Sequence, residues 1–221
     1  MPSLWHYLSR APMKARKLYF PKRAERLHIG SGPQALPSWV NVDNVRYPGV
    51  DVLLDVTRGL PFRDVRFIFA EHFIEHLTLH EAMYFIRECR RVLREDGVLR
   101  LTTPDLDWVW ASHYAVGAAA EDAVRSCFHL NRAFRAWGHQ FLYNEATLSS
   151  LLRDAGFTTV VRREYGRSEH PELQNLERHE RSEDYEGLAD ILIVEASGTG
   201  GTAPAYLERP RRDFFTDLGA R

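Results

Sequence analysis

The sequence has little of what secreted, membrane-spanning or general nucleic-acid-binding proteins require. Its 221 residues include two cysteines, which are too few for a disulfide framework. No apolar run approaches the ~20 residues of a membrane span, and the opening stretch, MPSLWHYLSR, lacks the apolar core of a signal peptide. The formal net charge is -1, which argues against general nucleic-acid binding. We therefore expect a cytoplasmic protein with no membrane span and no nucleic-acid partner.

Charge and glycine are unevenly distributed, and their distribution suggests where the folded domain begins and ends. Basic side chains crowd residues 1–25, interleaved with aromatic residues, and Glu25 is their one acidic neighbour. This segment is predicted to be an N-terminal basic extension, either a helix covering the sheet edge or one that meets a membrane surface or a partner. The stretch SGTGGT, which begins at Ser197, is typical of a flexible linker. We therefore predict a domain over residues 26–196 and a flexible C-terminal tail over residues 197–221.

Phosphate-binding motifs are also missing, although a glycine turn follows the first apolar segment. The stretch LHIGSG runs from Leu27 to Gly32, and its glycines allow a sharp turn and a close approach to a ligand. No Lys-Ser/Thr pair follows it, as a Walker-type site requires, and Ala35 stands where a dinucleotide fingerprint has its third glycine. A nucleoside without a pyrophosphate therefore fits this turn better than NAD or ATP.

Short apolar segments recur along the first half of the chain, and each is followed by polar or glycine residues. The predicted strands cover residues 27–29, 39–42, 52–54, 65–69 and 98–102. The residues that follow the first four are Gly30, Asp43, Asp55 and the pair Glu71 and His72. In an open α/β sheet, ligands bind at the carboxyl ends of the strands. The pattern therefore predicts a nucleotide-type pocket at that edge.

A helix is predicted between the fourth and fifth strands. Thr78 and Glu81 have the spacing of a capping box, and apolar residues repeat at helical spacing from Leu79 to Leu93. Gly97 is predicted to end this helix in a left-handed conformation. Further helical segments are predicted over residues 105–136 and 144–155, and strands over residues 158–163 and 191–195. This alternation predicts an α/β fold with a doubly wound, mostly parallel sheet, whose closing pair of strands could run antiparallel to each other.

Two aspartates at predicted strand ends are candidates for nucleoside recognition. The Asp43 carboxylate can accept hydrogen bonds from both hydroxyls of a ribose. Each hydrogen bond to a charged group is worth roughly 1.5–3 kcal/mol. Asp55 is placed to accept from a donor such as the exocyclic amine of a base. The alternative for each is a loop cap or an Asx-turn, which the same residue type favours.

Five longer motifs follow one another along the chain. They are LHIGSGPQALPSWVNVD, DVTRGLPF, FAEHFIEHL, RECRRVLREDGVLRLTTPDLD and GHQFLYNEATLSSLLRDAGF. Together they resemble the class I S-adenosylmethionine-dependent methyltransferases, in particular the small type often found in polysaccharide and secondary-metabolite gene clusters. The resemblance covers about Arg26 to Glu195. It implies a Rossmann-like methyltransferase fold with a helical insertion after the fifth strand, and methyl transfer from S-adenosylmethionine with S-adenosylhomocysteine as product.

The resemblance also implies a set of cofactor-binding residues. They are Gly30, Ser31, Gly32, Asp43, Asp55, Val56 and Glu71. Gly30 and Gly32 would line the methionine part of the cofactor, and Asp43 would hold the ribose. Asp55 and the backbone of Val56 would meet the adenine.

Histidines supply the candidate catalytic residues. By the resemblance, Glu71 and His72 border the transferred methyl, and the loop WGHQFLY, with His139, covers the substrate side of the pocket. A neutral imidazole suits a general base that takes a proton from a hydroxyl. His139 and His72 are therefore the candidate bases, although His139 equally fits a residue that caps a helix or packs a loop. Residues 113–114 and 170–172 are candidates for substrate specificity only.

Two alternatives to an ordinary methyltransferase remain open. His72, Glu75 and His76 match the H-x-x-E-H pattern of inverted zinc peptidases, in which two histidines share one face of a helix. The second alternative is a non-catalytic module that serves a partner enzyme. It stays open because His28 and Arg66 stand where the family often has acidic residues. The prediction is methyl transfer to an oxygen of a sugar or small metabolite, with no metal ligands assigned.

Overall fold

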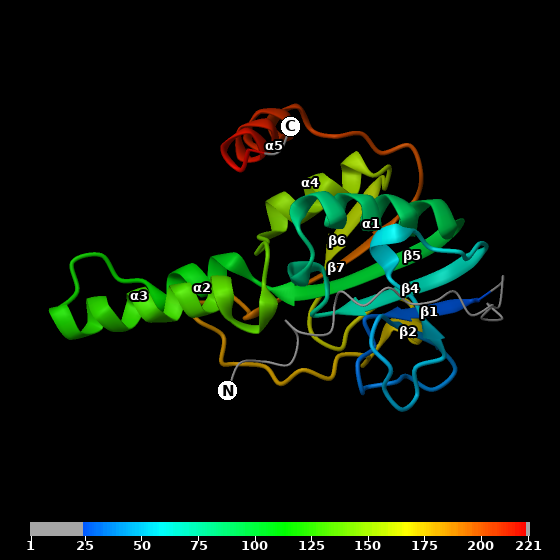
Figure 1. Ribbon diagram of the computed structural model, residues 1–221, viewed down its shortest axis with the longest axis horizontal. Helices are drawn as coiled ribbons and strands as arrows, with labels where there is room; N and C mark the ends of the chain where they lie inside the picture. The colour runs from blue at the N-terminus through cyan, green and yellow to red at the C-terminus, as the bar shows by residue number, and fades with distance from the viewer. Residues whose placement is uncertain (1–23, 220–221) are drawn as a thin grey trace.

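The computed structural model describes residues 24–219 of the chain (Figure 1). The predicted N-terminal basic extension, residues 1–25, lies almost wholly outside this range. Within the described range, no helix combines the length and the apolar character that crossing a membrane requires.

A seven-stranded sheet forms the centre of the protein, with the strand order β3-β2-β1-β4-β5-β7-β6. The strands are β1 (Arg26–Ile29), β2 (Val40–Asp43), β3 (Val52–Leu53), β4 (Val65–Glu71), β5 (Leu93–Pro104), β6 (Thr159–Arg162) and β7 (Ile191–Ser197). Neighbours among β1 to β5 pair in parallel, whereas β7 is antiparallel to both β5 and β6. The predicted doubly wound, mostly parallel sheet with an antiparallel closing pair is confirmed. The strand order reverses between β1 and β4, and a sheet of this kind binds ligands beyond that switch point.

Helices cover one face of the sheet and extend beyond one end of it. In the described residues they are α1 (Leu79–Val92), α2 (Leu106–His113), α3 (Ala120–Arg135), α4 (Glu145–Asp154) and α5 (Ala205–Asp217). Short 3-10 turns are η2 (Val56–Arg58), η3 (Ile74–His76), η4 (Ala136–Gly138) and η5 (Pro171–Leu173). Figure 1 shows α1 and α4 over one face, while α2 and α3 extend from the carboxyl end of β5 as an arm. This arm is the predicted helical insertion after the fifth strand.

Helix α1 begins as predicted and ends earlier than predicted. Thr78 and Glu81 form the reciprocal capping box, so two backbone N–H groups at the helix start have side-chain acceptors. The prediction that Gly97 ends the helix was wrong, because α1 stops at Val92 and Gly97 lies inside β5. A Cβ at Gly97 would lie 3.0 Å from the Val65 carbonyl oxygen. This glycine is therefore explained by the close approach of β4, not by a helix end.

The segment after β7 contains a helix where the sequence predicted a flexible tail. Leu207 of α5 is buried, and Phe214 and Phe215 pack against the main apolar core. Arg211 adds an ion pair to Asp154 at the end of α4, with a nitrogen–oxygen distance of 3.1 Å. The glycine-rich stretch from Ser197 therefore joins β7 to a docked helix.

Residues 166–190, which we call the strap, cross the sheet face opposite α1. Arg100 of β5 is fully buried there, and its Nε donates to Glu177 of the strap at 2.8 Å. Its Nη1 donates to Glu195 of β7 at 2.6 Å and to the Arg167 carbonyl at 2.9 Å. A buried guanidinium needs such partners, because an unpaired buried charge is very costly. The network therefore fixes the strap against the sheet, close to the carboxyl ends of the strands.

Candidate active site

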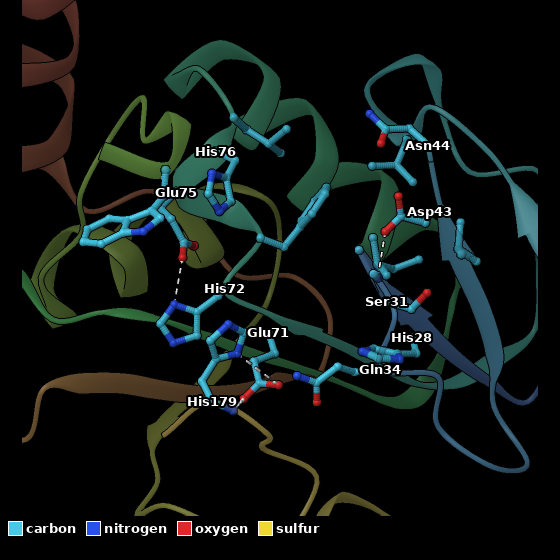
Figure 2. Close-up of a pocket in the computed structure, with 18 of the residues that line it drawn as sticks. His28, Ser31, Gln34, Asp43, Asn44, Glu71, His72, Glu75, His76 and His179 are labelled. Atoms are coloured by element: carbon cyan, nitrogen blue, oxygen red, sulfur yellow. Dashed lines mark hydrogen bonds and ion pairs between the residues drawn. The ribbon is translucent and has the colours of Figure 1, made fainter. Parts of the chain in front are cut away.

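A cavity of about 750 Å³ opens at the carboxyl ends of β1 to β4. All seven predicted cofactor-binding residues line it, as do the candidate bases His72 and His139. Figure 2 shows the two sides of this cavity, with Asp43 and Ser31 on one side and His72, Glu75 and His76 facing them on the other. Loops that follow different strands therefore meet here, as the sequence pattern predicted.

The glycine turn after β1 adopts a backbone that other residues rarely reach. Gly30 and Gly32 have φ angles of 66° and 50°. A Cβ on Gly30 would lie 2.5 Å from Cδ2 of Phe73, so a side chain there has no room. The Gly32 N–H donates to Asp43 Oδ2 at 2.8 Å. The turn and the end of β2 therefore form one rigid unit at the cavity wall.

Asp43 is 5% exposed and points into this unit. Its second oxygen, Oδ1, accepts from the Val45 N–H at 2.7 Å. Each carboxylate oxygen has two lone pairs, so both can still accept from a ligand. Beside it, the buried Ser31 hydroxyl has no hydrogen-bond partner among the described residues. This wall thus offers acceptors and one unsatisfied hydroxyl to a polar ligand.

Asp55 lies on the cavity rim and is exposed. Its Oδ1 accepts from the N–H and the hydroxyl of Thr57, at 3.1 and 2.6 Å, and its Oδ2 lies 3.1 Å from Nε of Arg58. These contacts form the loop cap that the sequence analysis gave as the alternative to nucleoside recognition by Asp55. The neighbouring Val56 is buried and also lines the cavity.

His28, which stands where the family often has an acidic residue, lies at the cavity floor. Its Nδ1 is 3.0 Å from Oδ1 of Asn41, and its ring stacks on Phe69 with centroids 5.4 Å apart. Burial lowers the pKa of His28, an effect larger than the opposing hydrogen bond to Asn41. The ring is therefore neutral near pH 7 and adds no charge beneath the glycine turn.

The carboxylate of Glu71, at the end of β4, accepts hydrogen bonds from the strap. Its Oε1 accepts from the backbone N–H groups of Arg178 and His179, at 2.8 and 3.1 Å. The His179 Nδ1 lies 3.5 Å from Oε2. Burial acts to raise the pKa of Glu71, but the hydrogen bonds from His179 and Arg178 outweigh it and lower that pKa. In turn, the bond to Glu71 raises the pKa of His179. The carboxylate therefore anchors the strap at the cavity, and its predicted contact with a cofactor stays a prediction.

Glu75, His76 and His139 form a compact cluster at the far side of the cavity. One side-chain nitrogen or oxygen from each lies within 4.8 Å of the others. Glu75 is fully buried, and its Oε1 lies 3.1 Å from Nδ1 of His72. Burial acts to raise the pKa of Glu75, yet the neighbouring His72 reverses that effect, so the pKa is lowered. The carboxyl group is therefore ionised at neutral pH.

The structure does not have the helix on which the H-x-x-E-H interpretation depended. The 3-10 turn η3 begins only at Ile74, and His72 precedes it with a φ of 45°. His72 and His76 consequently do not share a helical face, and that part of the alternative was wrong. The third member of the cluster is His139 from the loop after η4, a residue predicted as a base rather than a ligand.

A second cavity of about 320 Å³ adjoins the first and is walled by α2 and α3. The residues that line both cavities are His72, Pro104, Trp137, His139, His179 and Glu180. His113, a predicted specificity residue, lines the second cavity, whereas His170 packs against Phe67 and lines neither. The boundary between the two cavities is thus built largely from aromatic rings.

Sequence reasoning missed several of these lining residues. Trp137, with a φ of 58° in η4, belongs to the WGHQFLY loop that was predicted to cover the pocket, but it was not itself named as a lining residue. His179 and Glu180 come from the strap, which carried no motif. The strap is held at the cavity by its hydrogen bonds to Glu71 and to the buried Arg100. These contacts link positions far apart in the sequence, so no local pattern predicts them.

Comparison with known proteins supports the resemblance seen in the motifs. No protein-family model matches the chain. Two proteins from two strains of Mycobacterium tuberculosis, each described as a probable S-adenosylmethionine-dependent methyltransferase, are 32% identical to it over 118 residues. The match covers 52% of this chain and 36% of each relative. The similarity therefore extends over about half of this chain, and the chain matches only about a third of the length of each relative.

Solved structures that match the chain share little sequence with it. The YcgJ protein from Bacillus subtilis is 13% identical, with a TM-score of 0.49, over 83% of this chain and 95% of that one. The S-adenosylmethionine-dependent methyltransferase SibL, in its apo form, is 15% identical, with a TM-score of 0.49, over 80% of this chain and 51% of that one.

Proposed function

We propose that this chain, a relative of the class I S-adenosylmethionine-dependent methyltransferases, is a methyltransferase that acts on an oxygen of a sugar or small metabolite. The observation that carries the proposal is the wall formed by the glycine turn and Asp43. It presents a buried carboxylate, a close-approach backbone and an unsatisfied hydroxyl to a cavity of about 750 Å³ at the switch point of the sheet. This combination suits a nucleoside with a small polar substituent and no pyrophosphate.

The cofactor residues have distinct roles in this proposal. Gly30 and Gly32 admit the methionine part closely, because neither has a side chain at the turn. Asp43 accepts from the ribose hydroxyls with the lone pairs that Gly32 and Val45 leave free. The Ser31 hydroxyl, which otherwise lacks a partner, bonds to a polar group of the cofactor.

The adenine end of the cofactor is assigned to the rim. The buried Val56 supplies an apolar wall, and its backbone and the Asp55 carboxylate supply polar contacts. Asp55 keeps its cap to Thr57 while doing so, because Oδ1 accepts both bonds from Thr57 and Oδ2, which lies 3.1 Å from Nε of Arg58, still has a free lone pair. Glu71 contributes at the methyl end indirectly, by fixing the strap that closes this side.

The second cavity is the proposed acceptor site. When bound, S-adenosylmethionine supplies a methyl group activated by a sulfonium. The protein mainly aligns the acceptor oxygen with that methyl, so that the oxygen–carbon bond forms as the sulfur–carbon bond breaks. The acceptor's proton goes to a base at the junction of the cavities. The candidate bases are His72 and His139, which line both cavities; Nδ1 of His139 donates to the Ala133 carbonyl at 2.7 Å, so Nε2 has the lone pair in the neutral ring.

Calorimetric titration with S-adenosylhomocysteine tests the cofactor assignment. The wild-type chain should bind one equivalent in the micromolar range. Asp43→Asn removes the charge and one acceptor oxygen, so binding should weaken by about 10-fold to 100-fold. Asp96→Ala, at an exposed position of β5, is the matched control and should bind as the wild type does. Absence of binding at millimolar ligand would contradict the enzyme proposal and favour a non-catalytic module.

A further inference from the structure

The cluster of Glu75, His76 and His139 has the composition of a metal site. It supplies two imidazoles and one carboxylate, with ligand atoms within 4.8 Å of one another. Nitrogen and oxygen ligands in this ratio suit Zn²⁺ and similar divalent transition metals. Ca²⁺ and Mg²⁺ prefer sets made of oxygen, which two histidines do not supply.

The carboxyl group of this cluster is buried with one oxygen unsatisfied. Glu75 is fully buried, and its Oε2 has no hydrogen-bond partner among the described residues. Its other oxygen, Oε1, lies 3.1 Å from His72 Nδ1. A buried carboxyl oxygen is stabilised by a hydrogen bond or by a bound metal. A metal ion at this point would give Oε2 the partner that it lacks.

The surrounding backbone holds the three residues in fixed relative positions. The Glu75 carbonyl accepts from the N–H groups of Gln140 and Phe141, at 2.7 and 3.3 Å, so η3 is tied to the loop that carries His139. The Ala133 carbonyl accepts from Nδ1 of His139, so in the neutral ring Nε2 is the nitrogen with the lone pair. Metal-binding histidines commonly have such a partner on the second nitrogen, since it fixes both tautomer and ring orientation. The loop of His139 and the turn of Glu75 and His76 are thus held in place before any ligand binds.

From this geometry we infer that Glu75, His76 and His139 bind a divalent transition metal ion, with Zn²⁺ as the best match, at the junction of the two cavities. Three protein ligands leave at least one coordination position open, as in catalytic zinc sites. His139 lines both cavities, so the open position faces the place where they meet. An acceptor oxygen bound there would be held in position, and the pKa of its hydroxyl would fall. Only this last step rests on the proposed function, and the metal site itself does not.

The metal site and the base assignment of His139 exclude each other. Both use the lone pair on Nε2, so a histidine that binds the ion cannot also take the acceptor's proton. A metal titration therefore decides which role the residue has.

The test is a Zn²⁺ titration of the full chain, freed of metal with a chelator and carrying no affinity tag. Isothermal calorimetry should show one Zn²⁺ per chain with micromolar or tighter affinity. Glu75→Gln keeps the shape of the side chain but loses its charge, and His139→Gln removes a ligand from a loop. Each should weaken binding at least 10-fold. His80→Gln, on the exposed side of α1, is the matched control and should bind within about 2-fold of the wild type.

A second measurement guards against variants that fail to fold. Zn²⁺ should raise the thermal unfolding midpoint of the wild type and of His80→Gln by mass action, and should not raise that of His139→Gln. Visible absorption bands of bound Co²⁺ should likewise appear in the wild type and vanish in His139→Gln. Absence of stoichiometric binding, or equal binding by His139→Gln and His80→Gln, would overturn the metal site.

Failure of this proposal is separable from failure of the proposed function. S-adenosylhomocysteine binding without Zn²⁺ binding would leave the methyltransferase proposal standing and return His139 to the role of base. Zn²⁺ binding without S-adenosylhomocysteine binding would support the metal site and contradict the cofactor assignment.

Discussion

Replacing Arg100 by methionine tests whether the buried ion network holds the strap in place. Arg100 and Glu177 are fully buried, so water cannot take over the contact when one partner is removed. Methionine keeps an apolar stem but leaves Glu177 without its cation. Breaking such a pair costs about 3–5 kcal/mol. Glu195 keeps Arg163 as a partner at 2.8 Å, so the expected loss is near the lower limit, about 3 kcal/mol.

Urea unfolding followed by circular dichroism measures this loss as a lower midpoint with an unchanged slope. For a chain of this size, about 3 kcal/mol corresponds to a fall in Tm of roughly 6–12 °C. The double variant Arg100→Met with Glu177→Leu removes both buried charges and should recover most of the stability. A loss below about 1 kcal/mol, or a double variant no more stable than the single one, would refute the role given to the network.

Three further predictions concern the cavity and the fold around it. The lowered pKa of Glu71 means that its contact with the strap stabilises the fold above the carboxyl's unfolded pKa and is lost as pH falls through the folded value. The raised pKa of His179 gives stability that is complete below its unfolded pKa and lost as pH rises through the folded value, so Glu71→Gln should flatten both sides of a stability–pH curve. Gly30→Ala should lower stability by roughly 1–3 kcal/mol and weaken S-adenosylhomocysteine binding, because its Cβ meets Phe73 and its φ is positive; normal binding in a calorimetric titration would contradict this. Thr78→Ala removes the capping box of α1 and should cost about 0.5–2 kcal/mol in urea unfolding, whereas Thr78→Ser should restore nearly all of it.

Local patterns in the sequence were enough to predict most of the sheet and the cavity wall formed by the glycine turn and Asp43. The capping box at Thr78 and the glycine turn depend on residues only a few positions apart, and both are present in the structure. Asp43 was placed correctly at the cavity because the end of a parallel strand fixes where its side chain lies. The sequence was therefore enough to place a residue wherever its position depends on neighbours close in the chain.

The predictions were wrong or incomplete where contacts between distant parts of the sequence determine the structure. Gly97 follows a helical pattern, but β5 begins four residues before it because Leu93 pairs with Val65 of β4. The composition after Ser197 is that of a linker, yet Leu207 finds a place in the core. His179 reaches the cavity through contacts between positions over 100 residues apart. Interactions of this kind leave no periodic signal in a single sequence.

The arm formed by α2, α3 and η4 supplies much of the wall of the second cavity, and the loops after β1, β2 and β3 supply the wall of the first (Figure 1). The arm is one continuous stretch of chain, and the loop that follows it is anchored by the Glu75 carbonyl. We call residues 106–138 the cassette. Evolution, or a chimera made in the laboratory, can replace the cassette to change what enters the second cavity while the glycine turn and Asp43 stay intact.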